Sequence, residues 1–343
     1  MSRILNNNNT EKTFQATRDS NIDLLRILAC FFVIGIHVSG TGLMKGRNYE
    51  IGSFNWLVCV IFDSFARWSV PVFVMISGCC LLNSNKIVSL SKLFGKYISR
   101  IFVALIVWSL FYAWVFHLPI MPLGSQGGHM WYLPMILGVY LTIPILQSLS
   151  TKILKYLVVI WFVFLCCAFF NNITNGNFHI LDIEHNFFLD YVGYFVLGHL
   201  LYQQKRTLTT NIFIYLSGIV SFIVTIFCTY WFTRQGNELN EIFFGYLSPN
   251  VLFMSMAIFV FATDKKRSIS IPFINSFIIS IFACTFGIYL AQMFFLAQIY
   301  SRVLRFVPNP IFYIPLVCLL TFGFGYIIVY LIRKIPVISN YIV

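Results

Sequence analysis

The chain has 343 residues, of which 59% are hydrophobic and only 10% are charged, and its mean hydropathy is +0.82. A soluble domain carries about 25% charged residues, so this composition excludes an ordinary soluble protein and indicates that a lipid bilayer surrounds most of the chain. The net charge of +12 does not indicate a nucleic-acid partner, because the basic residues lie mostly in short segments between apolar runs, as topology signals do.

The predicted fold is an all-α, polytopic membrane helix bundle with about ten transmembrane helices. Residues 1–20 are polar and rich in asparagine, so we expect a disordered cytoplasmic tail, no cleaved signal peptide, and one transmembrane domain over 21–343. Apolar runs of bilayer length follow one another to the end of the chain. The expected helices are 22–41, 54–82, 97–116, 131–149, 153–170, 187–202, 212–232, 243–263, 273–299 and 311–332. The sixth is short, and the second and ninth are long enough to tilt or break.

The distribution of Lys and Arg predicts the orientation of the bundle. If the N-terminus is cytoplasmic, most of the 23 basic residues fall in loops on that side, while Arg302 and Arg305 are among the few in outer loops. This asymmetry predicts a multi-pass protein of the bacterial inner membrane with both termini cytoplasmic. Lys86 to Lys96 then face the cytoplasm, and Gln126 to His129 face the periplasm.

The nine cysteines all fall inside apolar runs, and none has a polar C-x-x-C context. Cysteine in such runs is typically a small hydrophobic residue of the core. We therefore predict free cysteines, with neither a disulfide framework nor a metal site.

The first helix carries three ionisable residues, Asp23, Arg26 and His37, each of which costs roughly 2.5–3.5 kcal/mol at membrane depth on insertion scales. Arg26 and His37 are about three helical turns apart, so both lie on one face, with His37 roughly 16 Å further out. Asp23 precedes Arg26 at a spacing that favours an ion pair. Arg26 could be a snorkelling anchor paired with Asp23, and His37 could be a hydrogen-bonding partner of another helix. The functional alternative makes His37 a general base that activates a hydroxyl group.

The second helix contains Asp63 and Arg67, four residues apart with the acid first. This spacing predicts a structural ion pair that makes Arg67 tolerable inside the membrane. Pro71 follows and can kink the helix. Ser77-Gly78 lies near its inner end, where small residues permit close contact between helices.

Two further clusters lie at opposite faces of the membrane. Lys92, Lys96 and Arg100 surround the start of the third helix, where they are either topology signals or a phosphate-binding cluster for a cofactor. His129, Trp131 and Tyr132 open the fourth helix, as part of an interfacial aromatic belt or as an acceptor-binding site whose rings stack on sugar faces.

At these residues the chain resembles the acyltransferase 3 family of membrane acyltransferases, nearest the branch that contains the enterobacterial common antigen and O-antigen O-acetyltransferases. The matching stretches run in family order over nearly the whole chain. They are Ile22-Asp23-Leu24-Leu25-Arg26 with His37, Ser69 to Gly78, His129 to Leu133, Tyr140-Leu141 with Pro144, and Phe286-Gly287-Ile288-Tyr289-Leu290.

The resemblance implies transfer of an acyl group, usually acetyl, from cytoplasmic acyl-CoA to a hydroxyl of a surface polysaccharide. Arg26 and His37 match the family's catalytic pair, and Lys96 and Arg100 match its basic motif loosely. Family members often have histidine shortly after the Gly-Ile-Tyr motif, but this chain has Gln292, so no role carries over there.

The expected partners are acyl-CoA as donor substrate, a glycan or lipid-linked glycan as acceptor, and membrane lipid, with no permanently bound cofactor and no nucleic acid. A transporter or flippase of glycans or small molecules is the rival hypothesis, because buried charges among ten helices suit that class too. The sequence leaves open the acceptor sugar, its hydroxyl position and the oligomeric state. It also does not distinguish direct transfer from an acyl-enzyme.

Overall fold

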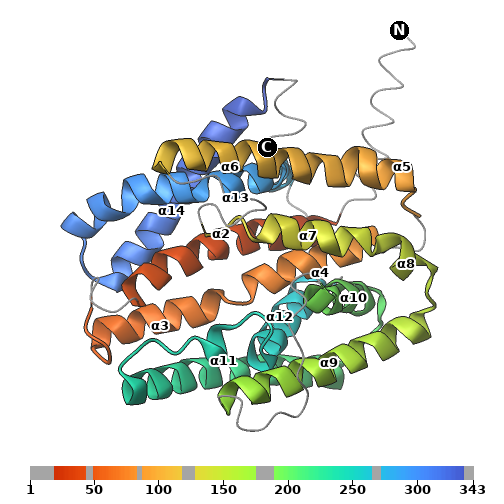
Figure 1. Ribbon diagram of the computed structural model, residues 1–343, viewed down its shortest axis with the longest axis horizontal. Helices are drawn as coiled ribbons and strands as arrows, with labels where there is room; N and C mark the ends of the chain where they lie inside the picture. The colour runs from red at the N-terminus through yellow and green to blue at the C-terminus, as the bar shows by residue number, and fades with distance from the viewer. Residues whose placement is uncertain are drawn as a thin grey trace.

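The computed structural model describes residues 19–43, 49–82, 87–117, 128–174, 189–264 and 272–335. Within these ranges the chain is built from helices, and no β-strand occurs, which confirms the all-α prediction (Figure 1). Eight of the helices there are long and apolar enough to cross a membrane, and a ninth, Tyr132–Ser148, is shorter. The expected short sixth helix is Leu189–Gln203. The expected disordered tail lies outside the described residues, apart from its last two positions.

The helices follow the order of the predicted apolar runs. In chain order they are α2 (Ser20–Leu43), α3 (Phe54–Ala66), α4 (Ser69–Leu81), α5 (Leu90–Lys92), a π-helical segment (Leu93–Ile98), α6 (Ser99–Phe116), α7 (Tyr132–Leu141), α8 (Ile143–Ser148), α9 (Thr151–Ile173), α10 (Leu189–Gln203), α11 (Leu208–Gly236), a 3-10 turn (Ile242–Phe244), α12 (Pro249–Ala262), α13 (Pro272–Phe306) and α14 (Pro310–Ile332).

Polar caps set where several helices begin. A side-chain oxygen at the N-cap accepts a hydrogen bond from a backbone N–H in the first turn, which would otherwise have no partner inside the helix. The residues that cap in this way are Ser53, Ser89, Ser150, Thr207 and Asn309. Polar residues between the apolar runs therefore define the helix ends as well as the loops.

Prolines explain two breaks inside predicted helices. The second predicted helix divides into α3 and α4 at Arg67-Trp68, because Pro71 has no N–H to donate to the carbonyl of Arg67. The fourth divides into α7 and α8 at Thr142, two residues before Pro144. Hence the expected break of the second helix is confirmed, while the break of the fourth was not predicted.

The third helix begins earlier than predicted and contains a π-helical segment. It starts at Leu90 rather than at residue 97, so Lys92 and Lys96 lie on the helix and not in a loop. In the π-helical segment the backbone N–H of Ser99 donates to the carbonyl of Phe94, five residues back. Such wider turns change which side chains share a face of a helix.

The ninth predicted helix extends further than expected. α13 continues to Phe306 instead of ending at residue 299. Arg302 and Arg305, expected in an outer loop, therefore lie on its last turns. Apolar residues such as Val303, Leu304 and Phe306 continue the helix beyond the arginines, so the charges did not mark its end.

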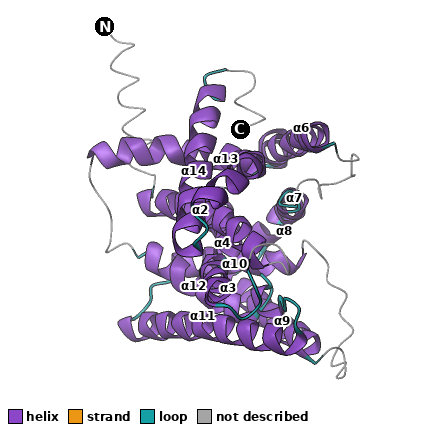
Figure 2. Ribbon diagram, turned by 90° about the vertical axis from the view of Figure 1, so that its left-hand side faces the viewer, coloured by secondary structure: helices purple, strands orange, loops and turns teal. Residues whose placement is uncertain are grey.

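The core lies where α4 packs against α10 and α2 packs against α3 and α13. Figures 1 and 2 both place α2 and α4 centrally, with α6 at one edge of the molecule and α9 and α11 at the opposite edge. Gly78 and Gly198 allow the closest approach, because a Cβ on Gly78 would clash with the carbonyl oxygen of Phe195, and one on Gly198 with that of Met75. The predicted role of Gly78 in close helix contact is thus confirmed.

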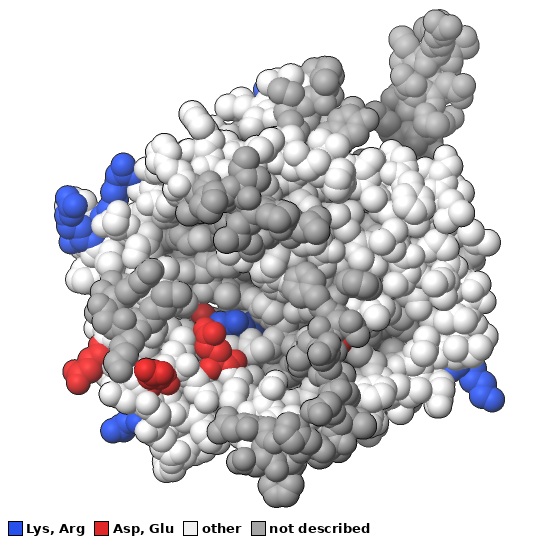
Figure 3. Space-filling view, viewed as in Figure 1, with Lys and Arg blue, Asp and Glu red and all other residues white. Residues whose placement is uncertain are grey.

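The outer helices present apolar side chains at the surface. On α9 only Leu154 and Leu165 are buried, and α11 exposes large residues such as Phe213 and Phe227. In Figure 3 most of the charged side chains lie toward the left, one basic group lies at the lower right margin, and the described surface on the right-hand side is otherwise largely uncharged. This uncharged surface matches the surface that a bilayer would cover.

Candidate active site

A cavity of about 490 Å³ lies among α2, α4, α7, α13 and the helix that contains the π-helical segment. Residues far apart in the sequence meet around it. The predicted site residues that line it are Arg26, His37, Lys92, Lys96, Arg100, His129, Trp131 and Tyr132. The predicted ion-pair residues Asp23, Asp63 and Arg67 are not among the lining residues.

Helix α13 shows how the lining residues are ordered along the cavity. The Arg26 guanidinium carbon lies 5.3 Å from the ring centroid of Phe282, and that of Arg100 lies 5.3 Å from the ring of Phe286. One turn further on, the Tyr289 ring lies 5.4 Å from that of His129. Since α13 rises about 1.5 Å per residue, the contacts of the two arginines and of His129 are separated by roughly 5–10 Å along α13.

Positive charge dominates the end of the cavity near the arginines. Lys92 and Lys96 are exposed there, and Arg100 is half-buried. In an ideal α-helix positions 92 and 100 would face about 80° apart, so the π-helical segment between them helps to bring both to the same cavity. No acidic residue occurs among the described lining residues. This end is suited to an anionic ligand with several phosphate groups.

Arg26 does not form the predicted pair with Asp23. Asp23 is buried, but no ion pair joins it to Arg26 in the described part of the chain. The guanidinium lies over Phe282, and its buried Nε has no hydrogen-bond partner there. Arg26 therefore lines the cavity while its guanidinium packs on a ring of α13.

The two histidines of the cavity lie close together, with ring centroids 6.2 Å apart and ring planes nearly perpendicular. His129 is held by its neighbours, because its Nε2 lies 3.3 Å from the carbonyl oxygen of Leu290 and Tyr289 donates a hydrogen bond to its backbone carbonyl. His37 lines the cavity and makes no hydrogen bond to a described residue. Its ring nitrogens are therefore the ones that can reach a ligand.

The ion pair between Asp63 and Arg67 is present, as predicted. Asp63 also accepts a hydrogen bond of 2.9 Å from the Ser39 hydroxyl on α2. Arg67 donates to the carbonyl of Phe244 at 3.2 Å, and its guanidinium lies over the rings of Phe244 and Tyr246, at 4.4 and 5.7 Å. The pair thus joins α2 and α3 to the segment before α12.

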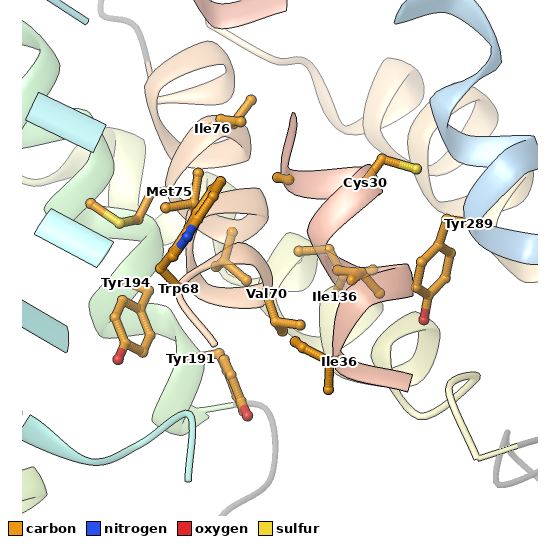
Figure 4. Close-up of a cluster of buried hydrophobic side chains, with 14 of the residues drawn as sticks. Cys30, Ile36, Trp68, Val70, Met75, Ile76, Ile136, Tyr191, Tyr194 and Tyr289 are labelled. Carbon is orange, nitrogen blue, oxygen red and sulfur yellow. The ribbon is translucent and has the colours of Figure 1, made fainter. Parts of the chain in front are cut away.

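Several aromatic and polar residues of the cavity were not assigned from the sequence. Tyr246 and Tyr289 line it beside Trp131 and Tyr132, and Figure 4 shows the Tyr289 ring beside the helix that carries Cys30. Ser77 and Tyr140 also line it, and the Tyr140 hydroxyl lies 3.4 Å from the Ser77 Oγ. Tyr289 and Tyr140 belong to the stretches that resemble the family named above, and this resemblance was the signal that could have identified them. Nothing in the sequence pointed to Tyr246.

Gln292 stands apart from this group. Its side chain is 1% exposed, it is not among the lining residues, and neither its Oε1 nor its Nε2 has a hydrogen-bond partner in the described part of the chain. Gln292 occupies the region where related proteins often have histidine. It does not take part in the cavity lining.

Comparison with protein families assigns the chain to a family. The acyltransferase domain family matches residues 19–330, which include every helix of the bundle except the last residues of α14. The chain belongs to the acyltransferase 3 family. The comparisons with curated proteins and with solved structures returned no match. As a member of this acyltransferase family with eight described membrane-length helices, the protein is a multi-pass membrane acyltransferase.

Proposed function

We propose that this acyltransferase moves an acyl group, most simply acetyl, from cytoplasmic acyl-CoA to a hydroxyl of a cell-surface polysaccharide such as O-antigen or common antigen. It would act in the bacterial inner membrane with both termini in the cytoplasm. Family membership supports acyl transfer over the rival hypothesis of transport. One observation carries the proposal: the basic residues and His37 line the same cavity.

The charges of the cavity indicate which end would bind the acyl donor. Acyl-CoA carries several phosphate groups, and Lys92, Lys96 and Arg100 would bind them at the cytoplasmic side. The pantetheine arm would then pass Arg26, which lines the cavity with its guanidinium over the ring of Phe282. Arg26 and His37 are roughly 16 Å apart along α2, so the two residues contact different parts of a bound donor.

The chemical step belongs to His37 in this proposal. Its neutral imidazole would accept the proton of the acceptor hydroxyl while the oxygen attacks the thioester carbonyl. The carbon–sulfur bond of the thioester breaks, and the departing CoA sulfur takes up a proton to leave as the thiol. In the alternative route His37 itself carries the acyl group before the hydroxyl attacks. Both routes require a ring nitrogen that is free toward the cavity.

The test is the substitution His37→Gln, which keeps a hydrogen-bonding side chain of similar reach but removes the base. We expect acetyl transfer from labelled acetyl-CoA to surface glycan to fall roughly 10²–10⁴-fold, at unchanged protein level in the membrane. His199→Gln is the matched control, because His199 is a buried histidine of α10 outside the lining residues. Near-normal transfer by His37→Gln would remove His37 from the chemistry. A wild-type protein that transfers no acyl group would contradict the proposed reaction.

A further inference from the structure

The buried ion pair of α3 lies directly behind the aromatic part of the cavity. Arg67 is only 13% exposed and Asp63 is fully buried, and the pair is tied to α2 through Ser39. Ser39 follows His37 by two residues. On its other side Arg67 contacts Phe244 through the backbone carbonyl and the ring, and the ring of Tyr246.

Tyr246 extends this contact into the cavity. Its ring stacks on that of Trp131, with centroids 5.7 Å apart and planes 23° apart, and both rings line the cavity. The backbone carbonyl of Tyr246 accepts a hydrogen bond of 2.6 Å from the Tyr194 hydroxyl of α10, which Figure 4 shows beside Tyr191. Trp131 and Tyr246 together form what we call the aromatic wall.

We propose that the aromatic wall binds a sugar ring of the acceptor, and that Arg67, held by Asp63, is the positioning residue that fixes Tyr246 in it. This inference rests on the proposed function, since it assigns the acceptor of that reaction to a surface. A pyranose ring presents C–H groups on its faces, which pack on aromatic rings, while its hydroxyls require polar neighbours. His37 lines the same cavity and supplies such a neighbour.

The position of Arg67 explains why a charge is retained inside the membrane. An Asp–Arg pair that served packing alone could be replaced by apolar residues of similar volume without loss of stability. Here the planar guanidinium makes contacts that only arginine provides, because it stacks over aromatic rings while donating to a carbonyl and a carboxylate. Through Ser39 the same pair fixes the wall relative to the helix that carries His37.

The test compares Tyr246→Leu with Tyr246→Phe. The acceptor is surface oligosaccharide freed of its esters by mild alkali, labelled with a fluorophore, and titrated against purified protein in detergent. We expect Tyr246→Leu to weaken binding roughly 2- to 10-fold and Tyr246→Phe to preserve it, because the phenyl ring keeps the stacking surface. In the transfer reaction the KM for oligosaccharide should rise by the same factor, while the KM for acetyl-CoA and kcat stay unchanged.

Arg67→Lys tests the positioning role, because lysine keeps the charge beside Asp63 but lacks the planar group. It should raise the KM for oligosaccharide like Tyr246→Leu and leave acetyl-CoA binding unchanged. Phe227→Leu is the control, since Phe227 stacks on Trp231 at the exposed surface of α11.

The outcomes separate the wall from the reaction. Equal oligosaccharide binding by wild type and Tyr246→Leu, or no binding by the wild type, would overturn the aromatic wall. Binding that depends on the Tyr246 ring, without any acyl transfer, would overturn the proposed reaction and leave the wall intact.

Discussion

The histidines of the cavity differ in what their ring nitrogens contact. His129 is fixed by the Leu290 carbonyl, which can only accept a hydrogen bond, so the Nε2 of His129 carries the proton in this contact. His37 has no such bond to a described residue, although the two rings are 6.2 Å apart. A residue that reacts with a ligand needs a free nitrogen, whereas a residue that shapes a binding site benefits from being held.

The individual basic residues of the cavity give a prediction about donor binding. Lys96→Ala combined with Arg100→Ala should weaken acyl-CoA binding at least about tenfold, because hydrogen bonds to charged groups contribute about 1.5–3 kcal/mol. Added salt should weaken binding by the wild type and have a smaller effect on the double variant. Equilibrium binding of acetyl-CoA to purified protein measures both effects.

The control for this pair is Lys152→Ala combined with Lys155→Ala. Both lysines are exposed at the start of α9 and do not line the cavity. Unchanged acetyl-CoA affinity in the Lys96/Arg100 variant would make these two residues topology signals alone.

Much of the cavity lining could be predicted from helical periodicity and from unusual residue types. Arg26 and His37 share a face of one helix, and a charge inside an apolar run is visible in any sequence. Tyr246 could not be predicted, because its place depends on the cation that follows α3 and on the ring that precedes α7. Among the described residues no ion pair joins Asp23 to Arg26, because the spacing that permits such a pair does not prevent Arg26 from packing over Phe282 of another helix.

At the scale of the helices, the contact between α4 and α10 depends on two glycines. Gly78→Ala or Gly198→Ala places a methyl group against backbone of the opposite helix, which cannot move as a side chain could. Overpacking of a core costs about 1–3 kcal/mol, and a clash with backbone belongs at the upper end of this range. We expect lower thermal stability of the purified protein, followed by fluorescence or by size-exclusion chromatography after heating.

Gly323→Ala supplies the comparison within the same bundle. A Cβ at Gly323 of α14 would meet nothing within 4 Å, so alanine there should leave stability unchanged or raise it slightly. Equal stability of the Gly78, Gly198 and Gly323 variants would show that α4 and α10 can separate without cost.

The existence of the helices could be predicted, while their internal breaks were harder to locate. Bilayer-length apolar runs identify a span by composition, and each expected span corresponds to helix in the structure. The π-helical segment Leu93–Ile98 has no comparable signal, because a π turn depends on one shifted set of backbone hydrogen bonds and not on residue type. The break between α7 and α8 does have a signal, Pro144, although a proline alone does not show whether a helix kinks or ends.

At the scale of the whole molecule, the charged and the apolar parts of the surface indicate which part a bilayer would cover. In Figure 3 a largely uncharged described surface separates the charged groups on the left from the basic group at the lower right, and acidic and basic side chains share a hollow left of centre. Exposed apolar residues such as Phe213 and Phe227 belong to the apolar part of the surface. A bilayer would therefore cover this part of the molecule and leave the charged groups in water.

The positive-inside rule makes this orientation testable. Cysteine introduced at Lys92 should react with a membrane-impermeant maleimide only after the cytoplasmic side is opened, whereas cysteine at Glu238 should react in cells whose outer membrane alone is permeable. Both positions are exposed in the structure. The parent chain with its native cysteines gives the background, and labelling at position 92 from the periplasm would invert the proposed topology.

The cationic lining of the cavity also affects whether ions can cross the bilayer through the protein. A polar cavity within a membrane protein thins the low-dielectric layer that separates two aqueous phases. Arg26 and Arg100 line this cavity, and a hydronium or sodium ion that entered it would meet charge of its own sign where screening by water is weak. The same residues that attract an anionic ligand therefore oppose the entry of cations into the cavity.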